Sequence, residues 1–155
     1  MSITLDIRIE STEWTNLPNC EVICSTAADA TGLTGVVDVL LTDDAAMHAL
    51  NKAWRGKDKP TDVLSFPAEI DDLETSQAAP FLGDVAIGFG VSAKDAAAQE
   101  KSLAAHLSHL IIHGILHLAG HDHIDAADAK EMEGLEISAL AKLGYDNPYV
   151  YQTKS

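Results

Sequence analysis

The segment LSHLIIHGILHL, at residues 107–118, decides the fold, because it is apolar around almost its whole circumference. A helix of that composition is stable in the interior of a protein, where other elements cover every side of it. Its polar members include His109, His113 and His117, which need partners when they are buried. We therefore expect a central buried helix that bears histidines, with the rest of the chain packed around it.

The sequence on either side alternates between the patterns of strands and of helices. Apolar residues at period two, or in short branched runs, predict four strands at residues 3–9, 35–42, 62–66 and 83–89. Helical patterns with capping residues at their ends predict helices at residues 19–30, 45–54 and 125–143. Residues 92–120 are also helical, either as one helix or as two with Ser102 as an internal cap. The acidic stretch at residues 68–80 is expected to be a surface loop.

Together these elements predict an α+β fold, a single domain in which a small mixed four-stranded sheet packs with helices around the central histidine-bearing helix. The length of 155 residues fits one domain over residues 1–155, large enough to bury roughly 70% of its unfolded surface. No apolar run approaches the roughly 20 residues of a membrane-spanning helix, and the first residues lack the pattern of a secretory signal. We therefore expect neither a membrane-spanning nor a secreted protein.

The charge of the chain is lopsided, with 10 Lys and Arg against 24 Asp and Glu and a formal net charge of −14. Such a composition argues against a general polyanion binder, since affinity for phosphate backbones comes from clustered positive charge. Four of the basic residues nevertheless lie in one short stretch: Lys52, Arg55, Lys57 and Lys59. This stretch is either a solvated turn or a local cationic rim that meets one phosphate-bearing partner.

Six of the seven histidines lie between His106 and His123, with a spacing that is typical of a metal site. On a helix, His113 and His117 share one face, so that their ring nitrogens can reach one ion at about 2.1 Å. Gly120 can adopt the left-handed conformation that ends a helix, which brings His123 round as a third ligand. A shared cation would also satisfy imidazoles that otherwise cost about 1–3 kcal/mol each when buried.

The ligand spacing equals that of the zinc-protease motif H-E-x-x-H-x-x-G-x-x-H, except that Gly114 stands where those proteases keep their general base. A protease of that mechanism is therefore disfavoured. Three neutral ligands leave a fourth position open, which is the arrangement of a catalytic ion. Zinc is the default ion for three imidazoles, with nickel, copper and iron as alternatives. His106 and His109 are either supporting groups or polar residues at the helix edge, and His121 is a further candidate ligand.

These motifs resemble those of the YbeY family of bacterial metallo-endoribonucleases. The family's pattern H-G-x-L-H-L-x-G-[YH]-D-H is matched by HGILHLAGHDH at residues 113–123. Further blocks of similarity are Leu50-Asn51, residues 54–67, residues 82–88, Leu143-Gly144 and Asn147-Pro148-Tyr149. The similarity thus extends over residues 50–149, while the first third of the chain matches only in layout.

The resemblance implies a single α+β domain that holds one zinc ion through His113, His117 and His123, with the family's arginine at Arg55. It also implies a cytoplasmic bacterial enzyme that cleaves single-stranded RNA, acting at the 3′ end of small-subunit ribosomal RNA and in ribosome quality control. A net charge of −14 is a departure for a protein that handles RNA. It favours a protein partner that presents the substrate, such as a small-subunit ribosomal protein or the GTPase Era.

Cleavage of a phosphodiester fits these residues. An open-site cation can polarise phosphorus or supply hydroxide. Arg55 can clamp the phosphoryl oxygens through two parallel hydrogen bonds, a geometry that Lys cannot match, while Lys57 and Lys59 can hold flanking phosphates. The identity of the general base stays open, and the candidates are bound hydroxide, His121 and the 2′-hydroxyl of the RNA.

Two other functions stay open as alternatives. A non-catalytic ribosome-assembly factor, whose metal only holds the fold, would close the site with a fourth protein ligand such as His121. A metal hydrolase of another substrate, a peptide or a small phosphoester, would keep its activity after loss of Lys57 and Lys59.

Overall fold

The computed structural model describes residues 2–68, 80–121 and 125–149 of the chain. At its centre is a four-stranded sheet with the strand order β1-β2-β4-β3. The strands are β1 (Ile3–Ile9), β2 (Gly35–Thr42), β3 (Val63–Pro67) and β4 (Phe81–Gly88). β2 pairs in parallel with both β1 and β4, while β3 runs antiparallel to β4 at one edge. The sheet is therefore mixed, as the sequence predicts.

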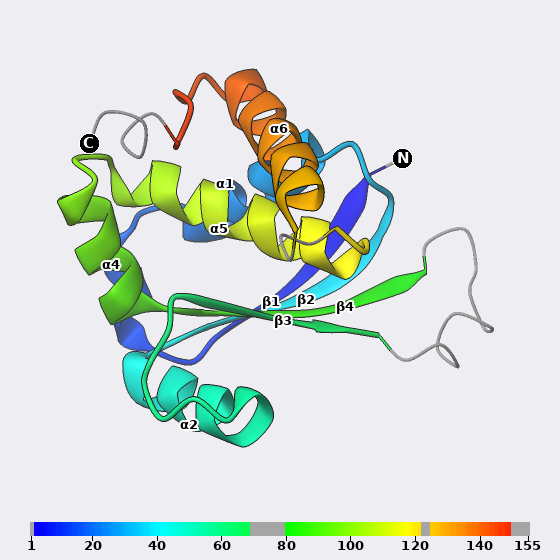
Figure 1. Cartoon of the computed structure of the whole chain (residues 1–155). Helices are drawn as coiled ribbons and strands as arrows, with labels where there is room; N and C mark the ends of the chain where they lie inside the picture. The colour runs from blue at the N-terminus through cyan, green and yellow to red at the C-terminus, as the bar shows by residue number, and fades with distance from the viewer. Residues whose placement is uncertain (1, 69–79, 122–124, 150–155) are drawn as a thin grey trace.

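Helices lie on both faces of this sheet (Figure 1). They are the 3-10 helix η1 (Thr12–Asn16) and the α-helices α1 (Cys20–Ala30), α2 (Asp44–Arg55), α4 (Phe89–Ala98), α5 (Leu103–Leu118) and α6 (Ala126–Lys142). α1 and α5 cover one face, with α6 packed on α5, and α2 covers part of the other face. The expected α+β class is thereby confirmed. None of the described helices is long and apolar enough to cross a membrane.

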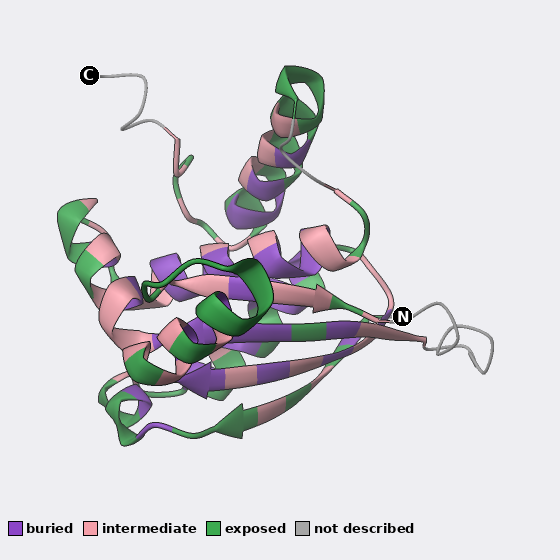
Figure 2. Cartoon of the chain, turned by 60° about the horizontal axis from the view of Figure 1, so that its bottom comes forward, coloured by how far each residue is buried: buried purple, intermediate pink, exposed green. Residues whose placement is uncertain are grey.

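α5 is the central element of the core. Leu107, Ile111 and Ile115 are each 0% exposed, and the helix packs against α1, α4, α6, β3 and β4. Figure 2 shows buried residues in the middle of the sheet and on the inward sides of the helices, with exposed residues on the outer surfaces. Burial of one such side chain contributes about 1.5–3 kcal/mol, so the surroundings of this helix are a main source of stability.

The helical stretch at residues 92–120 forms two helices rather than one. α4 ends at Ala98, and Glu100 then takes a left-handed conformation with a φ of 55°. Ser102 begins α5, because its hydroxyl accepts a hydrogen bond of 3.1 Å from the Ala105 amide. Ser102 is thus the internal cap that the sequence left open as one of two alternatives.

One short helix was not predicted, and the bounds of one predicted strand differ slightly. β4 runs from Phe81 to Gly88 instead of from residue 83 to 89, and the Phe89 ring after it packs edge-on against Trp14 with centroids 5.1 Å apart. Trp14 belongs to η1, which no sequence pattern predicted. Its indole is 0% exposed and donates from Nε1 to the Thr42 carbonyl oxygen at 2.9 Å. A tertiary contact between residues distant in sequence therefore fixes this helix, and local propensity does not reveal it.

Gly114 allows α5 to approach the sheet closely. A Cβ at this position would lie 2.9 Å from Val85 Cγ1 and 3.2 Å from Ser65 Oγ. The Ser65 hydroxyl donates to the Gly114 carbonyl oxygen at 3.1 Å, which ties β3 to the helix. Val85 is 1% exposed, and its branched side chain has little freedom to move. A glutamate, such as zinc proteases carry at the corresponding position, has no room here, so packing determines this residue.

Gly114→Ala should lower the free energy of unfolding by about 1–2 kcal/mol, since overpacking against Val85 outweighs the gain in helix propensity. Gly134→Ala in α6 is the matched control, because a Cβ there meets nothing within 4 Å. The control should raise the free energy of unfolding by about 0.5–1 kcal/mol. Urea denaturation measures the free energy of unfolding of both variants. If it rises equally in Gly114→Ala and Gly134→Ala, the close approach of α5 to the sheet is contradicted.

Candidate metal centre

The C-terminal end of α5 reverses the chain beside His117. The Gly120 amide donates to the His117 carbonyl oxygen and the His121 amide donates to the Leu116 carbonyl oxygen, both at 3.0 Å. This pair of hydrogen bonds is a Schellman motif, and it places Gly120 at a positive φ of 99°. The predicted role of Gly120, to end the helix and turn the chain back, is confirmed.

His113 and His117 lie on the same face of α5, as their spacing predicts. Their ring centroids are 4.7 Å apart and their planes cross at 77°. Both rings line a cavity of about 440 Å³, to which Ser65 and His121 also contribute. His123, the third predicted ligand, lies outside the described residues, so the set of three ligands stays a prediction.

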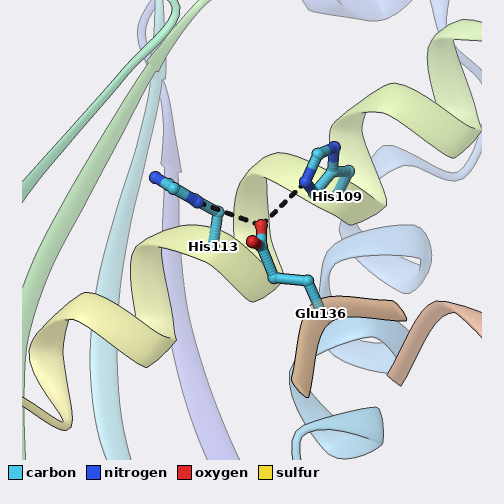
Figure 3. Close-up of side chains that lie close together, drawn as sticks. All are labelled: His109, His113 and Glu136. Carbon is cyan, nitrogen blue, oxygen red and sulfur yellow. Dashed lines mark hydrogen bonds and ion pairs between the residues drawn. The ribbon is translucent and has the colours of Figure 1, made fainter. Parts of the chain in front are cut away.

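A buried carboxylate from α6 contacts two histidines of α5 (Figure 3). Glu136 is 1% exposed, and its Oε2 lies 2.7 Å from His109 Nε2 and 3.0 Å from His113 Nδ1. Its Oε1 accepts a hydrogen bond of 2.5 Å from the Tyr149 hydroxyl. Donors on α5 and on the segment after α6 therefore hold this carboxylate from three sides.

These donors keep Glu136 ionised. Burial by itself would raise the pKa of this carboxyl group, but the hydrogen bonds from His109, His113 and Tyr149 outweigh burial and lower the pKa to about 2. Burial and the neighbouring Glu136 raise the pKa of Tyr149, so its hydroxyl stays protonated and donates. Because the carboxylate only accepts, the hydrogen bond requires a proton on Nδ1 of His113. Metal-binding histidines are commonly held in this way by a carboxylate.

His109, His113 and Glu136 are also a candidate metal site in their own right, since their ligand atoms lie within 4.8 Å of one another. The nitrogen–oxygen separations of 2.7 and 3.0 Å are those of hydrogen bonds. Tetrahedral ligands at about 2.0–2.1 Å from an ion would lie about 3.3 Å apart. The donor set thus fits a His-His-Glu metal site by its chemistry, while its distances fit a carboxylate that orients His113.

Arg55, at the end of α2, lines the same cavity as His113 and His117. The structure therefore brings together residues that the sequence analysis singled out from separate motifs. No carboxylate in the described part of the chain forms an ion pair with Arg55. Its exposed guanidinium is thus available to an anionic ligand in the cavity.

The loop after Arg55 is anchored rather than loose. Gly56 ends α2 with a φ of 69°, and the side chain of the buried Asn51 donates to the Lys59 carbonyl oxygen at 2.9 Å. Lys57 and Lys59 are exposed on this loop and lie outside the lining of the histidine cavity. Of the four clustered basic residues, Arg55 is the one that lines the cavity, so the choice between a cationic rim and a solvated turn stays open for the lysines.

Glu136 is the part of this centre that no sequence motif indicated, while Tyr149 belongs to the Asn147-Pro148-Tyr149 block of family similarity but had no role assigned to it. A signal for Glu136 exists, because it falls on the buried stripe of α6 that Met132, Ala139 and Leu140 form. An ionisable residue on an apolar stripe must find partners when it is buried. Hydrophobic periodicity gives no signal for the role of Tyr149, because this residue follows the last helix in a segment without regular secondary structure.

Fold and site together define a small α+β protein with a histidine-rich candidate metal centre. The model of a protein family described as Endoribonuclease YbeY matches residues 6–144. Endoribonuclease YbeY of Paramagnetospirillum magneticum is 46% identical over 162 residues, which cover 96% of this chain and 98% of that protein. Endoribonuclease YbeY of Erythrobacter litoralis is 53% identical, covering 72% of this chain and 72% of that protein.

One further relative and one solved structure also match. Endoribonuclease YbeY of Sphingopyxis alaskensis is 51% identical over 81% of this chain and 77% of that protein. The solution structure of TM1509 from Thermotoga maritima matches with a TM-score of 0.48 and 25% identity, covering 90% of this chain and 92% of that chain. By the family model and the relatives, the chain belongs to the YbeY family of endoribonucleases. The resemblance seen in the sequence motifs is confirmed.

Tyr149→Phe should lower the free energy of unfolding by about 1.5–3 kcal/mol, because it removes a hydrogen bond to a buried ionised carboxylate. Tyr145→Phe is the matched control, since the Tyr145 ring packs against the core and its hydroxyl makes no hydrogen bond within the described residues. The control should change stability by less than about 0.5 kcal/mol. Chemical denaturation measures the free energy of unfolding of both variants. Equal losses of stability in Tyr149→Phe and Tyr145→Phe would contradict the role assigned to the Tyr149 hydroxyl.

Proposed function

We propose that this chain is a zinc-dependent endoribonuclease that cleaves single-stranded RNA during ribosomal RNA maturation. One observation carries the proposal: His113, His117 and Arg55 line one cavity, so that an ion site and a phosphate-binding guanidinium share the same space. The relatives bear the name endoribonuclease, which supports RNA as the substrate. In this proposal residues 1–155 form one metal-dependent endoribonuclease domain.

One Zn²⁺ per chain is held, in this proposal, by His113, His117 and His123. The fit rests on two imidazoles that share a helix face and on Glu136, whose contact with His113 Nδ1 makes Nε2 the nitrogen that would bind the ion. Glu136 is therefore a positioning residue rather than a ligand. A bound divalent cation supplies Lewis-acid polarisation of a phosphoryl oxygen and a water of lowered pKa.

Arg55 binds the phosphoryl group of the substrate in this proposal. Its planar guanidinium donates two parallel hydrogen bonds to non-bridging oxygens and keeps its charge at any working pH. Lys57 and Lys59 hold flanking phosphates as point charges from the exposed loop. The Asn51 contact to the Lys59 carbonyl oxygen anchors the backbone that carries these lysines, which in this proposal reduces the entropy lost on binding.

The proposed setting is the bacterial cytoplasm, with action at the 3′ end of small-subunit ribosomal RNA and in ribosome quality control. It rests on the family to which the chain belongs. A net charge of −14 opposes the approach of RNA to most of the surface. A small-subunit ribosomal protein, or the GTPase Era, is therefore proposed to present the substrate to the cavity.

Metal content tests the ligand set. Native protein should carry one equivalent of zinc by mass spectrometry, and His117→Ala and His123→Ala should lose both the zinc and the cleavage of a labelled single-stranded RNA. Glu136→Gln should keep its zinc but bind it about 10- to 100-fold more weakly. His48→Ala is the control, because His48 contacts Asp58 at 2.6 Å and does not line the cavity.

Two results would change the proposal. If Glu136→Gln loses zinc and His123→Ala keeps it, the ligands are His109, His113 and Glu136 instead. If RNA cleavage persists equally in native protein and in His117→Ala, the nuclease activity comes from a contaminant, and the assembly-factor alternative is favoured.

Arg55→Lys should keep the zinc and the fold but lower kcat/KM for RNA cleavage by about 10- to 100-fold, since one point charge replaces a bidentate donor. Arg8→Lys is the matched control, because Arg8 is exposed on β1 and pairs only with Glu10 among the described residues. Cleavage kinetics on a short labelled RNA compare both variants. Unchanged kinetics in Arg55→Lys would exclude a bidentate role for this arginine.

A further inference from the structure

A second group of potential ligands lies beside the histidine cavity and has no part in the proposed reaction. Asp62, Asp95 and His106 have ligand atoms within 4.8 Å of one another. Asp62 immediately precedes β3, Asp95 is on α4 and His106 is on the N-terminal half of α5. Figure 1 shows α4 and this end of α5 meeting at one end of the sheet. Three separate segments thus converge on one place.

His106 is the decisive member of this group. It is 3% exposed, and neither of its ring nitrogens has a hydrogen-bond partner within the described residues. Burial, followed by the charges of Lys101 and His109, lowers its pKa to about 4, so the ring is neutral near pH 7. Burial of a polar group without a partner is costly, and native structures rarely tolerate it without a ligand or a water.

His106 faces a cavity of about 330 Å³ that Asp62, Asp95 and Gln99 also line. Asp62 uses Oδ1 to accept from the Val63 amide at 2.7 Å, which leaves Oδ2 for a further partner. The Asp95 carboxylate has no hydrogen bond or ion pair within the described residues. Burial and the charge of Asp62 raise its pKa, although Lys94 and Lys101 oppose this shift. Two carboxylates and an imidazole therefore share a cavity, and no Lys or Arg in the described ranges forms an ion pair with either carboxylate.

We propose that Asp62, Asp95 and His106 form a second divalent-cation site, separate from the histidine centre. Two carboxylate oxygens and one neutral imidazole are the donor set of Mn²⁺ or Zn²⁺, and the cavity leaves room for waters to complete the coordination. A cation there would satisfy His106 and would relieve the repulsion between Asp62 and Asp95. Its affinity is lower than that of a site with three imidazoles, because Lys101 lies near enough to oppose it.

The site adjoins the histidine centre, because Asp62 and His113 line both cavities. A cation bound by His106 therefore adds positive charge next to the space in which His113, His117 and Arg55 meet. That charge would attract an anionic substrate whatever its identity. The proposal does not depend on RNA cleavage, since it is tested by cation binding alone.

Titration with Mn²⁺, followed by electron paramagnetic resonance, tests this site in protein loaded with one equivalent of zinc. The native protein should bind one Mn²⁺ per chain. Asp95→Asn and His106→Phe should each weaken this binding by more than about tenfold, since each removes a direct ligand. Asp84→Asn is the control, because Asp84 is also a carboxylate beside another one, Asp38, but is exposed and lies outside the cavity that His106 lines.

His117→Ala distinguishes the two sites, since it should lose the zinc of the histidine centre and still bind Mn²⁺ as the native protein does. Asp95→Asn leaves the buried His106 in place, so the test does not rely on a core substitution alone. The proposal is overturned if zinc-loaded native protein binds no Mn²⁺, or if Asp95→Asn binds it as tightly as Asp84→Asn does. It is equally overturned if His117→Ala abolishes the Mn²⁺ binding.

Discussion

The structure depends on the burial of one helix that is apolar on nearly every side and still carries imidazoles into the interior. Hydrophobic burial of α5 stabilises the fold, but each ring that enters with it loses its contact with water. Glu136 satisfies one nitrogen on each of two rings, because its carboxylate accepts from His109 Nε2 and His113 Nδ1, while His109 Nδ1 has no partner among the described residues. The same contact sets the tautomer of His113. A requirement of packing and a requirement of metal chemistry are therefore met by one buried carboxylate on α6.

The predictable features are those that a local pattern encodes. The central helix follows from its composition, the shared face of His113 and His117 follows from a spacing of four, and the chain reversal follows from Gly120. What could not be predicted depends on contacts between distant segments. η1 exists because the Trp14 indole reaches the Thr42 carbonyl oxygen, and nothing in its own five residues predicts a helix. Glu136 lies between these cases, since its place on a buried stripe was visible but its partners were not.

Gly114 shows how packing limits the chemistry open to this helix. The position that bears the general base in zinc proteases of the same histidine spacing is here pressed against Val85 and Ser65. A carboxylate there would require α5 to move away from β3 and β4, and the tie between Ser65 and the Gly114 carbonyl oxygen would be lost. The close approach of α5 to the sheet also brings β3 beside the helix face that bears His113 and His117. The same packing therefore forms one wall of the histidine cavity and excludes a carboxylate from position 114. A proton acceptor for the proposed reaction must therefore come from outside this helix position.

The charge distribution explains how an acidic chain can act on a polyanion. A net charge of −14 repels RNA at long range, but ions screen this field beyond about 8 Å at physiological salt. Contacts within that distance then decide binding. The cavity offers the guanidinium of Arg55, which has no carboxylate partner in the described part of the chain, but Asp62 also lines this cavity. Cations at the histidine centre and at the Asp62, Asp95 and His106 group would neutralise the nearest acidic residues in the same place. Positive potential would then exist only where cations are bound, so nonspecific affinity for RNA stays low while the loaded site attracts phosphate.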